Sequence, residues 1–153
     1  MKERGLTLRV NPLFLLILVL FFLTGMIKEA LVAFSLVILH EFTHVMIAYI
    51  CGFKVYKVEL FLFGGMAEYS DLMEMEPWQE IKIALSGPFF NIIFALLIYL
   101  IMEYNLLNTN DFITVYLLCL IRDYNLIIAG INLIPALPLD GGRVLRAILV
   151  YIT

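Results

Sequence analysis

The sequence contains few charged residues and few of the side chains that bind metals or form disulfides. Of its 153 residues, 15% are Asp, Glu, Lys or Arg, and it has two cysteines and two histidines. The net charge of −3 and the lack of a basic cluster exclude the electrostatic pattern of a nucleic-acid-binding protein. Neither Cys51 nor Cys119 lies at a metal-binding spacing, so both are expected to pack as small apolar side chains. No internal repeat is present, which excludes a repeat protein.

Apolar residues, by contrast, are abundant. They make up 63% of the chain, whose mean hydropathy is +1.01, whereas soluble domains are about 45–50% apolar. We therefore predict an all-α, polytopic transmembrane helical bundle in a lipid bilayer, with no separate soluble domain. The expected spans are residues 11–26, 30–51, 81–102 and 112–134, and a further helix starts at 143–153. Residues 6–24 lack a small-x-small cleavage site, so no cleaved signal peptide is expected.

Three segments depart from simple spans. Pro135 and Pro138 break the fourth span at its end. The pair Arg122-Asp123 is either accommodated inside the bundle or divides residues 112–134 into a short helix and a shorter span. Residues 54–70 alternate as in a strand and turn at Gly64-Gly65, which predicts a short membrane-associated β-hairpin. Such a hairpin either pairs with an extended substrate or lies on the membrane surface and closes the bundle.

The basic residues fall mainly on one side of the predicted spans. Cytoplasmic segments of membrane proteins carry an excess of Lys and Arg. Lys28 lies on one side and Arg122 lies within a span, whereas the other side carries eight basic residues: Lys2, Arg4, Arg9, Lys54, Lys57, Lys82, Arg143 and Arg146. This bias predicts that the N-terminus, the 53–80 segment and the end of the fourth span face the cytoplasm.

The residues His40-Glu41-Phe42-Thr43-His44 form an HExxH motif inside the second predicted span. Helical residues four apart share a face at about 6 Å, so both histidines can bind one metal ion. Glu41 flanks that face, where a carboxylate can act as general base on water activated by Zn²⁺. With two histidines in the chain, the pattern arises by chance roughly once in a thousand sequences. A charged side chain at mid-bilayer costs roughly 2.5–3.5 kcal/mol, so Glu41 indicates a functional site.

A catalytic zinc site usually has three protein ligands and one open position. The chain has no third histidine, so the third ligand must be Asp, Glu or Cys. Asp140 is the strongest candidate, because two prolines unwind the backbone before it and two glycines after it allow close approach to a neighbouring helix. The weaker candidates are aspartates expected in loops or in an ion pair: Asp71, Asp111 and Asp123. We predict one Zn²⁺ per chain, held by His40, His44 and Asp140.

The HExxH motif, together with Asn132-Leu133-Ile134-Pro135 and Leu139-Asp140-Gly141-Gly142, resembles the site-2 protease family of intramembrane zinc metalloproteases, peptidase family M50. The segment 124–142 is most similar to the sporulation-type branch, that of the stage IV sporulation protein FB. The resemblance covers most of the chain. It implies a three-helix catalytic core, Glu41 as general base, and cleavage of a membrane-associated protein near the cytoplasmic side. By analogy the substrate is a pro-sigma factor, and the resemblance allows for an inhibitory membrane partner.

Two further matches carry over from the family. Asn132 corresponds to the asparagine before the aspartate motif, and its amide can stabilise an oxyanion or form an interhelical hydrogen bond. Residues 86–91 resemble a Gly-Pro-x-x-Asn segment at the start of the third span. We expect Gly87 and Pro88 to be packing and kink residues there, and Asn91 to make a polar contact beside the site.

Together these observations predict an intramembrane zinc metalloendopeptidase with Glu41 and Asn132 as catalytic residues. One alternative is another HExxH membrane protease, which takes its third ligand from a later glutamate such as Glu103. A second is a non-catalytic membrane scaffold or chaperone, against which the intact Glu41 argues. A third, a metal transporter, needs a polar path through the bundle that the sparse carboxylates do not provide.

Overall fold

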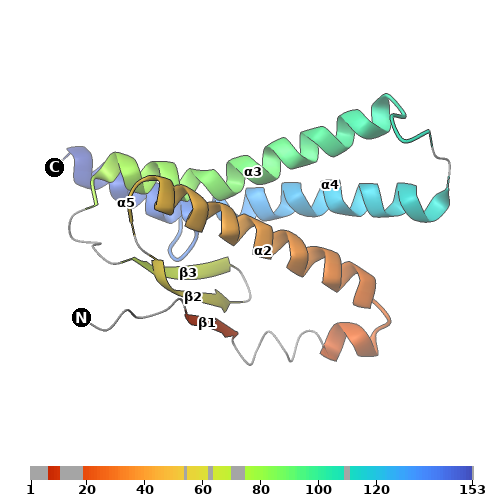
Figure 1. Ribbon diagram of the computed structural model, residues 1–153, viewed down its shortest axis with the longest axis horizontal. Helices are drawn as coiled ribbons and strands as arrows, with labels where there is room; N and C mark the ends of the chain where they lie inside the picture. The colour runs from red at the N-terminus through yellow and green to blue at the C-terminus, as the bar shows by residue number, and fades with distance from the viewer. Residues whose placement is uncertain are drawn as a thin grey trace.

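The computed structural model describes residues 7–10, 19–53, 55–61, 64–69, 75–108 and 111–152. Its long helices are α2 (Ile27–Ile50), α3 (Pro77–Glu103), α4 (Phe112–Asn132) and α5 (Asp140–Ile152). The strands are β1 (Thr7–Val10), β2 (Val55–Phe61) and β3 (Gly64–Tyr69). Helices α2, α3 and α4 come together at the end where α5 lies and spread apart toward the other end, and the strands lie beside α2 (Figure 1).

The helix ends follow from local sequence. Helix α3 begins with Pro77, which suits a first helical turn, and Glu76 and Gln79 form a reciprocal capping box. The Asp111 side chain accepts a hydrogen bond from the Thr114 backbone N–H at 3.1 Å and caps α4. After α2, Gly52 adopts a positive φ of 90°, a conformation that favours glycine and ends the helix.

Within the described residues, three helices are long and apolar enough to cross a membrane: Ile27–Ile50, Pro77–Glu103 and Phe112–Asn132. They match the predicted spans 30–51, 81–102 and 112–134 within a few residues. Of the predicted span 11–26, residues 11–18 lie outside the described residues, and residues 19–23 are helical.

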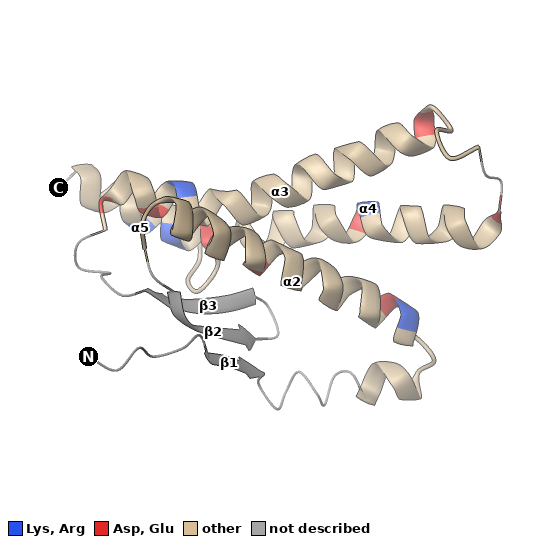
Figure 2. Ribbon diagram, in the orientation of Figure 1, with Lys and Arg blue, Asp and Glu red and all other residues tan. Residues whose placement is uncertain are grey.

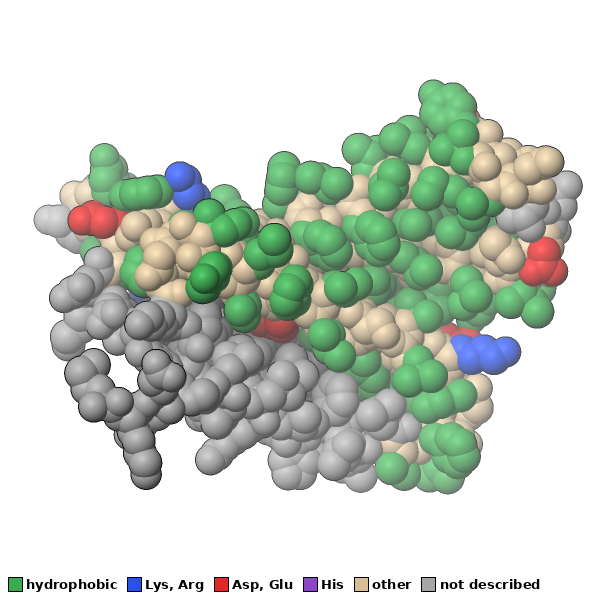
Figure 3. All heavy atoms as spheres, viewed as in Figure 1, with side chains coloured by type: hydrophobic (Ala, Val, Ile, Leu, Met, Phe, Trp, Pro, Cys, Tyr) green, Lys and Arg blue, Asp and Glu red, His purple; other side chains and the backbone are tan. Residues whose placement is uncertain are grey.

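The polarity of the described bundle is reversed relative to a soluble protein. Its buried apolar side chains are mostly alanines, which let helices approach closely, whereas large Leu, Ile, Phe and Tyr side chains lie on the outside. Figure 3 shows this apolar surface over the helices. Buried polar side chains are gathered inside instead: His40, Glu41, His44, Asn91, Asn125, Asn132 and Asp140. An apolar exterior around a polar interior is the pattern expected in a lipid bilayer.

An antiparallel strand pair lies where the sequence predicted a hairpin. Strand β2 pairs with β3 in the register Val55↔Tyr69 to Phe61↔Gly64. The structure adds a strand that the sequence reading lacked, because β1 pairs in parallel with the other side of β2. The order β1-β2-β3 makes β3 an edge strand of the described sheet.

The helices decide the point that the sequence left open, at Arg122-Asp123, and correct one expected helix start. Helix α4 runs through Arg122-Asp123 without a break, and the two side chains form an ion pair at 2.8 Å that is partly exposed. Helix α5 begins at Asp140 itself, three residues earlier than the predicted start at 143. The expected break before Asp140 covers residues 133–139, and Asp140 itself opens the next helix.

Candidate metal centre

Two helices bring three ligand atoms to one point. His40 and His44 stand four residues apart on α2, and their Nε2 atoms are 3.0 Å from each other. Asp140, the first residue of α5, places Oδ2 3.1 Å from each of these nitrogens. All three side chains are buried. Among the described residues, these three form the group of ligands that could hold a metal ion.

Both imidazoles are oriented through their other ring nitrogen. Nδ1 of His44 lies 2.7 Å from the Ile83 carbonyl oxygen, which can only accept, so this nitrogen carries the proton. Nδ1 of His40 lies 2.7 Å from Oδ1 of Asn91. With Nδ1 protonated, each Nε2 turns a lone pair toward the Asp140 carboxylate. Two such nitrogens and a carboxylate oxygen at this separation could hold a metal ion between them.

The donor set fits zinc. A zinc ion takes imidazole nitrogen and carboxylate oxygen at about 2.0–2.2 Å in tetrahedral geometry. Tetrahedral ligands at that radius lie about 3.3–3.5 Å apart, close to the separations of His40, His44 and Asp140. Three protein ligands leave the fourth position open, which is typical of catalytic rather than structural zinc.

A glycine of α3 makes room for the histidines. A Cβ added at Gly87 would lie 2.4 Å from Nε2 of His44 and 2.6 Å from Cε1 of His40. The sequence predicts that Gly87 is a packing and kink residue. Its role in the structure is narrower, because it allows the α3 backbone to lie directly against the two imidazoles.

The glycines after Asp140 act differently from the expectation. A Cβ at Gly141 would lie 2.4 Å from the Leu133 carbonyl oxygen, and one at Gly142 2.5 Å from the Ala136 carbonyl carbon. They therefore allow α5 to start against the 133–137 turn, rather than against a neighbouring helix. This contact fixes the direction from which Asp140 reaches α2.

Glu41 follows the first histidine of the group and is itself buried, with 6% of its surface exposed. A buried carboxylate beside the ligands is suited to exchange protons with a water molecule at the open position. Asn132, at the end of α4, is also buried, and its amide donates to the Ile128 carbonyl at 3.0 Å. One N–H of the Asn132 side chain is therefore used in a hydrogen bond within its own helix.

The competing ligands lie elsewhere. Asp111 caps α4 and Asp123 pairs with Arg122, as expected, whereas Asp71 lies outside the described residues. Glu103 ends α3, twelve residues and about 18 Å along the helix from Asn91, which touches His40.

The comparison with known protein families is decisive here. The sequence pattern of peptidase family M50 matches residues 29–153, which include the three ligands. The chain belongs to peptidase family M50. With the three candidate spans, this membership makes the chain an integral, multi-pass membrane protein.

Individual members of peptidase family M50 resemble the chain over most of its length. A zinc metalloprotease of Methanocaldococcus jannaschii is 32% identical over 97% of this chain and 44% of its own length. The stage IV sporulation protein FB of Bacillus subtilis is 29% identical over 92% of this chain and 46% of its own length. The solved structure of the site-2 protease from M. jannaschii matches with a TM-score of 0.80 and 30% identity, over 99% of this chain and 70% of that one. The chain thus spans less than half the length of these curated relatives.

The sequence predicts one of the two buried asparagines beside the site. Asn91 was expected to make a polar contact there, and it contacts His40 at 2.7 Å, whereas Asn125 was not singled out. The signal that could have identified Asn125 is polarity, because asparagine inside an apolar span is costly and needs a partner.

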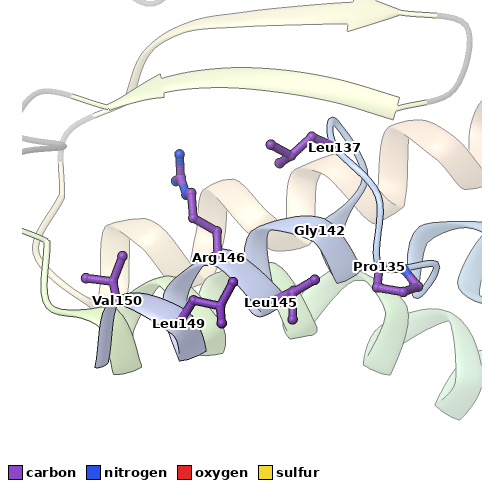
Figure 4. Close-up of a pocket in the computed structure, with 7 residues that line it drawn as sticks. All are labelled: Pro135, Leu137, Gly142, Leu145, Arg146, Leu149 and Val150. Atoms are coloured by element: carbon purple, nitrogen blue, oxygen red, sulfur yellow. The ribbon is translucent and has the colours of Figure 1, made fainter. Parts of the chain in front are cut away.

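An apolar groove of about 510 Å³ runs along α5. It lies between α5 and the turn before it, and its lining residues are Pro135, Leu137, Gly142, Leu145, Arg146, Leu149 and Val150. Figure 4 shows the lining residues on α5 and on the turn before it, and Arg146 forms an ion pair with Glu80 of α3. Gly142, Leu145 and Leu149 lie two, five and nine residues after Asp140, so the groove runs along the face of α5 away from the Asp140 side chain.

Proposed function

We propose that the chain is the core of an intramembrane zinc metalloendopeptidase, which hydrolyses a peptide bond in or near the membrane segment of a membrane-associated protein. The observation that carries the proposal is the convergence of His40, His44 and Asp140 at 3.0–3.1 Å inside an apolar bundle. Glu41 follows His40 in α2 and is buried, and a carboxylate next in sequence to a ligand supports a hydrolytic rather than a purely structural zinc site. Membership of peptidase family M50 supports the same activity.

The proposed roles follow from the chemistry of each side chain. His40, His44 and Asp140 hold the zinc ion. When bound, zinc supplies Lewis-acid polarisation of the scissile carbonyl and lowers the pKa of water toward 7. Glu41 accepts the proton from the attacking water and returns it to the leaving amine. An amide NH₂ has two donors, and we assign the second N–H of Asn132 to the developing oxyanion.

We propose that the site opens toward the cytoplasm. His44 lies six residues, about 9 Å, before the end of α2, so the metal centre is closer to that end than to the start of the helix. Figure 2 shows basic residues near this end, on α5 and the first part of α3, whereas Lys28 lies at the start of α2. The positive-inside rule then assigns the α5 end to the cytoplasmic side.

We further propose that the substrate binds as an extended segment along the groove beside α5. Amides of an intact helix are hydrogen-bonded and shielded, so proteolysis requires local unwinding. Strand β3 is an edge of the described sheet, as strand pairing requires, and the apolar groove offers contacts for alternate side chains. Likeness to the stage IV sporulation protein FB makes a membrane-tethered pro-sigma factor the first substrate to test.

The testing experiment compares wild type with Glu41→Gln. Both are purified in detergent, assayed for metal content, and incubated with a membrane-tethered pro-sigma factor. We expect about one zinc per chain in both proteins, and cleavage slower by about 10²–10⁴-fold in the variant, the range for loss of a general base.

Two results would contradict the proposal. Absence of bound zinc in folded wild type would remove the metal centre. Zinc in both proteins, with no difference in cleavage or cellular effect between them, would favour a non-catalytic scaffold or chaperone.

A further inference from the structure

A chain of buried amides leads away from His40 across three helices. Nδ1 of His40 on α2 contacts Oδ1 of Asn91 on α3 at 2.7 Å. Nδ2 of Asn91 donates to Oδ1 of Asn125 on α4 at 2.8 Å. Nδ2 of Asn125 in turn donates to the backbone carbonyl of Ile121 at 2.8 Å. Both asparagines are fully buried, with 0% of their surface exposed.

The orientation of both asparagine amides is set by the contact of Asn125 with the Ile121 carbonyl. A backbone carbonyl can only accept, so the end of the Asn125 amide that faces Ile121 must be the NH₂ group. The Asn125 oxygen then faces Asn91 and requires the NH₂ group of that residue. The Asn91 oxygen is left facing His40, and it requires a proton on Nδ1.

The reverse orientation fails at the same place. If both amides turned over, the Asn125 oxygen would lie about 2.8 Å from the Ile121 oxygen, so that two acceptors would face each other without a proton. The NH₂ group of Asn91 would then face Nδ1 of His40 and favour the tautomer protonated on Nε2. An imidazole in that tautomer cannot bind a metal through Nε2.

We propose that Asn91 and Asn125 are positioning residues that select the metal-binding tautomer of His40, with the Ile121 carbonyl as the fixed reference. The inference deepens the proposed function, since it concerns a ligand of the same site. It also separates the two histidines. His44 is set directly by the Ile83 carbonyl at 2.7 Å, whereas His40 depends on two side chains that can each turn over.

This proposal predicts that Asn125 affects zinc affinity although it does not touch a metal ligand. In Asn125→Leu, a side chain of similar size removes the acceptor that orients Asn91, and the Asn91 amide can turn over. We expect zinc affinity, measured by competition with a chelator, to fall about tenfold, the low end of the 10–100-fold typical of outer-shell partners. In the Co²⁺-substituted protein, the visible spectrum should change as well.

A second substitution tests the orientation itself. Aspartate at position 91 can only accept through both oxygens, so it presents an acceptor to His40 whichever way it is turned. The double variant Asn91→Asp/Asn125→Leu should therefore regain zinc affinity to within about threefold of wild type, since a carboxylate is also a common partner of metal-binding histidine. A merely structural role predicts the opposite, because a carboxylate buried beside leucine would destabilise the bundle further.

The matched control is Asn91→Leu alone and combined with Asn125→Leu. If Asn125 acts only through Asn91, the double leucine variant should bind zinc no more weakly than Asn91→Leu. Three results would each overturn the proposal. They are additive losses of zinc affinity in the double leucine variant, no recovery of affinity in Asn91→Asp/Asn125→Leu, and wild-type affinity in Asn125→Leu. None of these results would remove zinc or cleavage from the wild type, so the proposed function would stand or fall separately.

Discussion

Replacing Gly87 by alanine should distinguish the role of this residue at the metal centre from its effect on the stability of helix α3. Alanine favours a helix interior over glycine by about 1 kcal/mol, so an effect on the helix alone predicts a more stable protein. The new Cβ, however, would lie 2.4 Å from Nε2 of His44 and 2.6 Å from Cε1 of His40. Carbon and nitrogen in ordinary contact are about 3.4 Å apart, so His44 or the helix must move by about 1 Å.

A shift of about 1 Å is twice the roughly 0.5 Å within which a catalytic group must be held. Misplacement by that amount can lower the rate about 100-fold, equivalent to about 2.7 kcal/mol. We therefore expect Gly87→Ala to cleave substrate about 100-fold more slowly and to bind zinc more weakly.

The matched control is Gly130→Ala on α4. A Cβ at Gly130 meets no atom within 4 Å, so this substitution offers the same gain in helix preference without the contact. The assay measures zinc affinity by chelator competition, cleavage of a membrane-tethered substrate, and thermal unfolding of the apo protein in detergent. Wild-type zinc affinity and cleavage in Gly87→Ala, equal to those of Gly130→Ala, would refute the close approach of α3 to the histidines.

Two other predictions concern the ligands and the metal. Asp140→Asn should lower zinc affinity by more than about 100-fold, which exceeds the loss typical of an outer-shell partner, whereas Glu103→Gln should keep both zinc and cleavage. Metal analysis and a cleavage assay check this prediction. Zinc retained in Asp140→Asn would overturn the ligand assignment. Removal of zinc with a chelator should lower the thermal unfolding temperature, since zinc at 100 times its Kd stabilises the folded state by about 2.7 kcal/mol; an unchanged temperature, and no recovery on adding zinc back, would contradict tight binding to the folded protein.

The parts of the site that a single helix specifies could be read from the sequence. His40 and His44 share a face because α-helical periodicity places them there, and no tertiary information is needed. Asp140 was identified because the site lacked a third ligand and because prolines and glycines flank it. The structure brings these residues together, although it starts α5 at Asp140 rather than three residues later.

The parts that depend on how helices face each other could not be read in this way. Asn91 and Asn125 meet only because α3 and α4 pack with a particular rotation, and sequence spacing does not specify that rotation. Gly87 is similar, since Gly-Pro inside an apolar run is equally consistent with a kink. The parallel pairing of β1 with β2 joins segments about fifty residues apart and has no local signature.

The same contacts explain how a polar centre is accommodated among apolar helices. An unpaired polar group buried away from water costs roughly 1–3 kcal/mol, and a charged group costs more. In this bundle His40, His44, Asn91 and Asn125 each have a partner within 3 Å, so that cost is largely offset. Two neutral imidazoles and one carboxylate would leave a zinc ion with a net charge of +1, small enough for the interior to hold and for the nearby Glu41 to balance. Water needs to reach only the open position at the metal centre, and His44 lies about 9 Å before the end of α2. The irregular backbone of residues 133–139 comes just before α5, and such backbone is tolerated at membrane depth where it is buried in protein or lines a cavity.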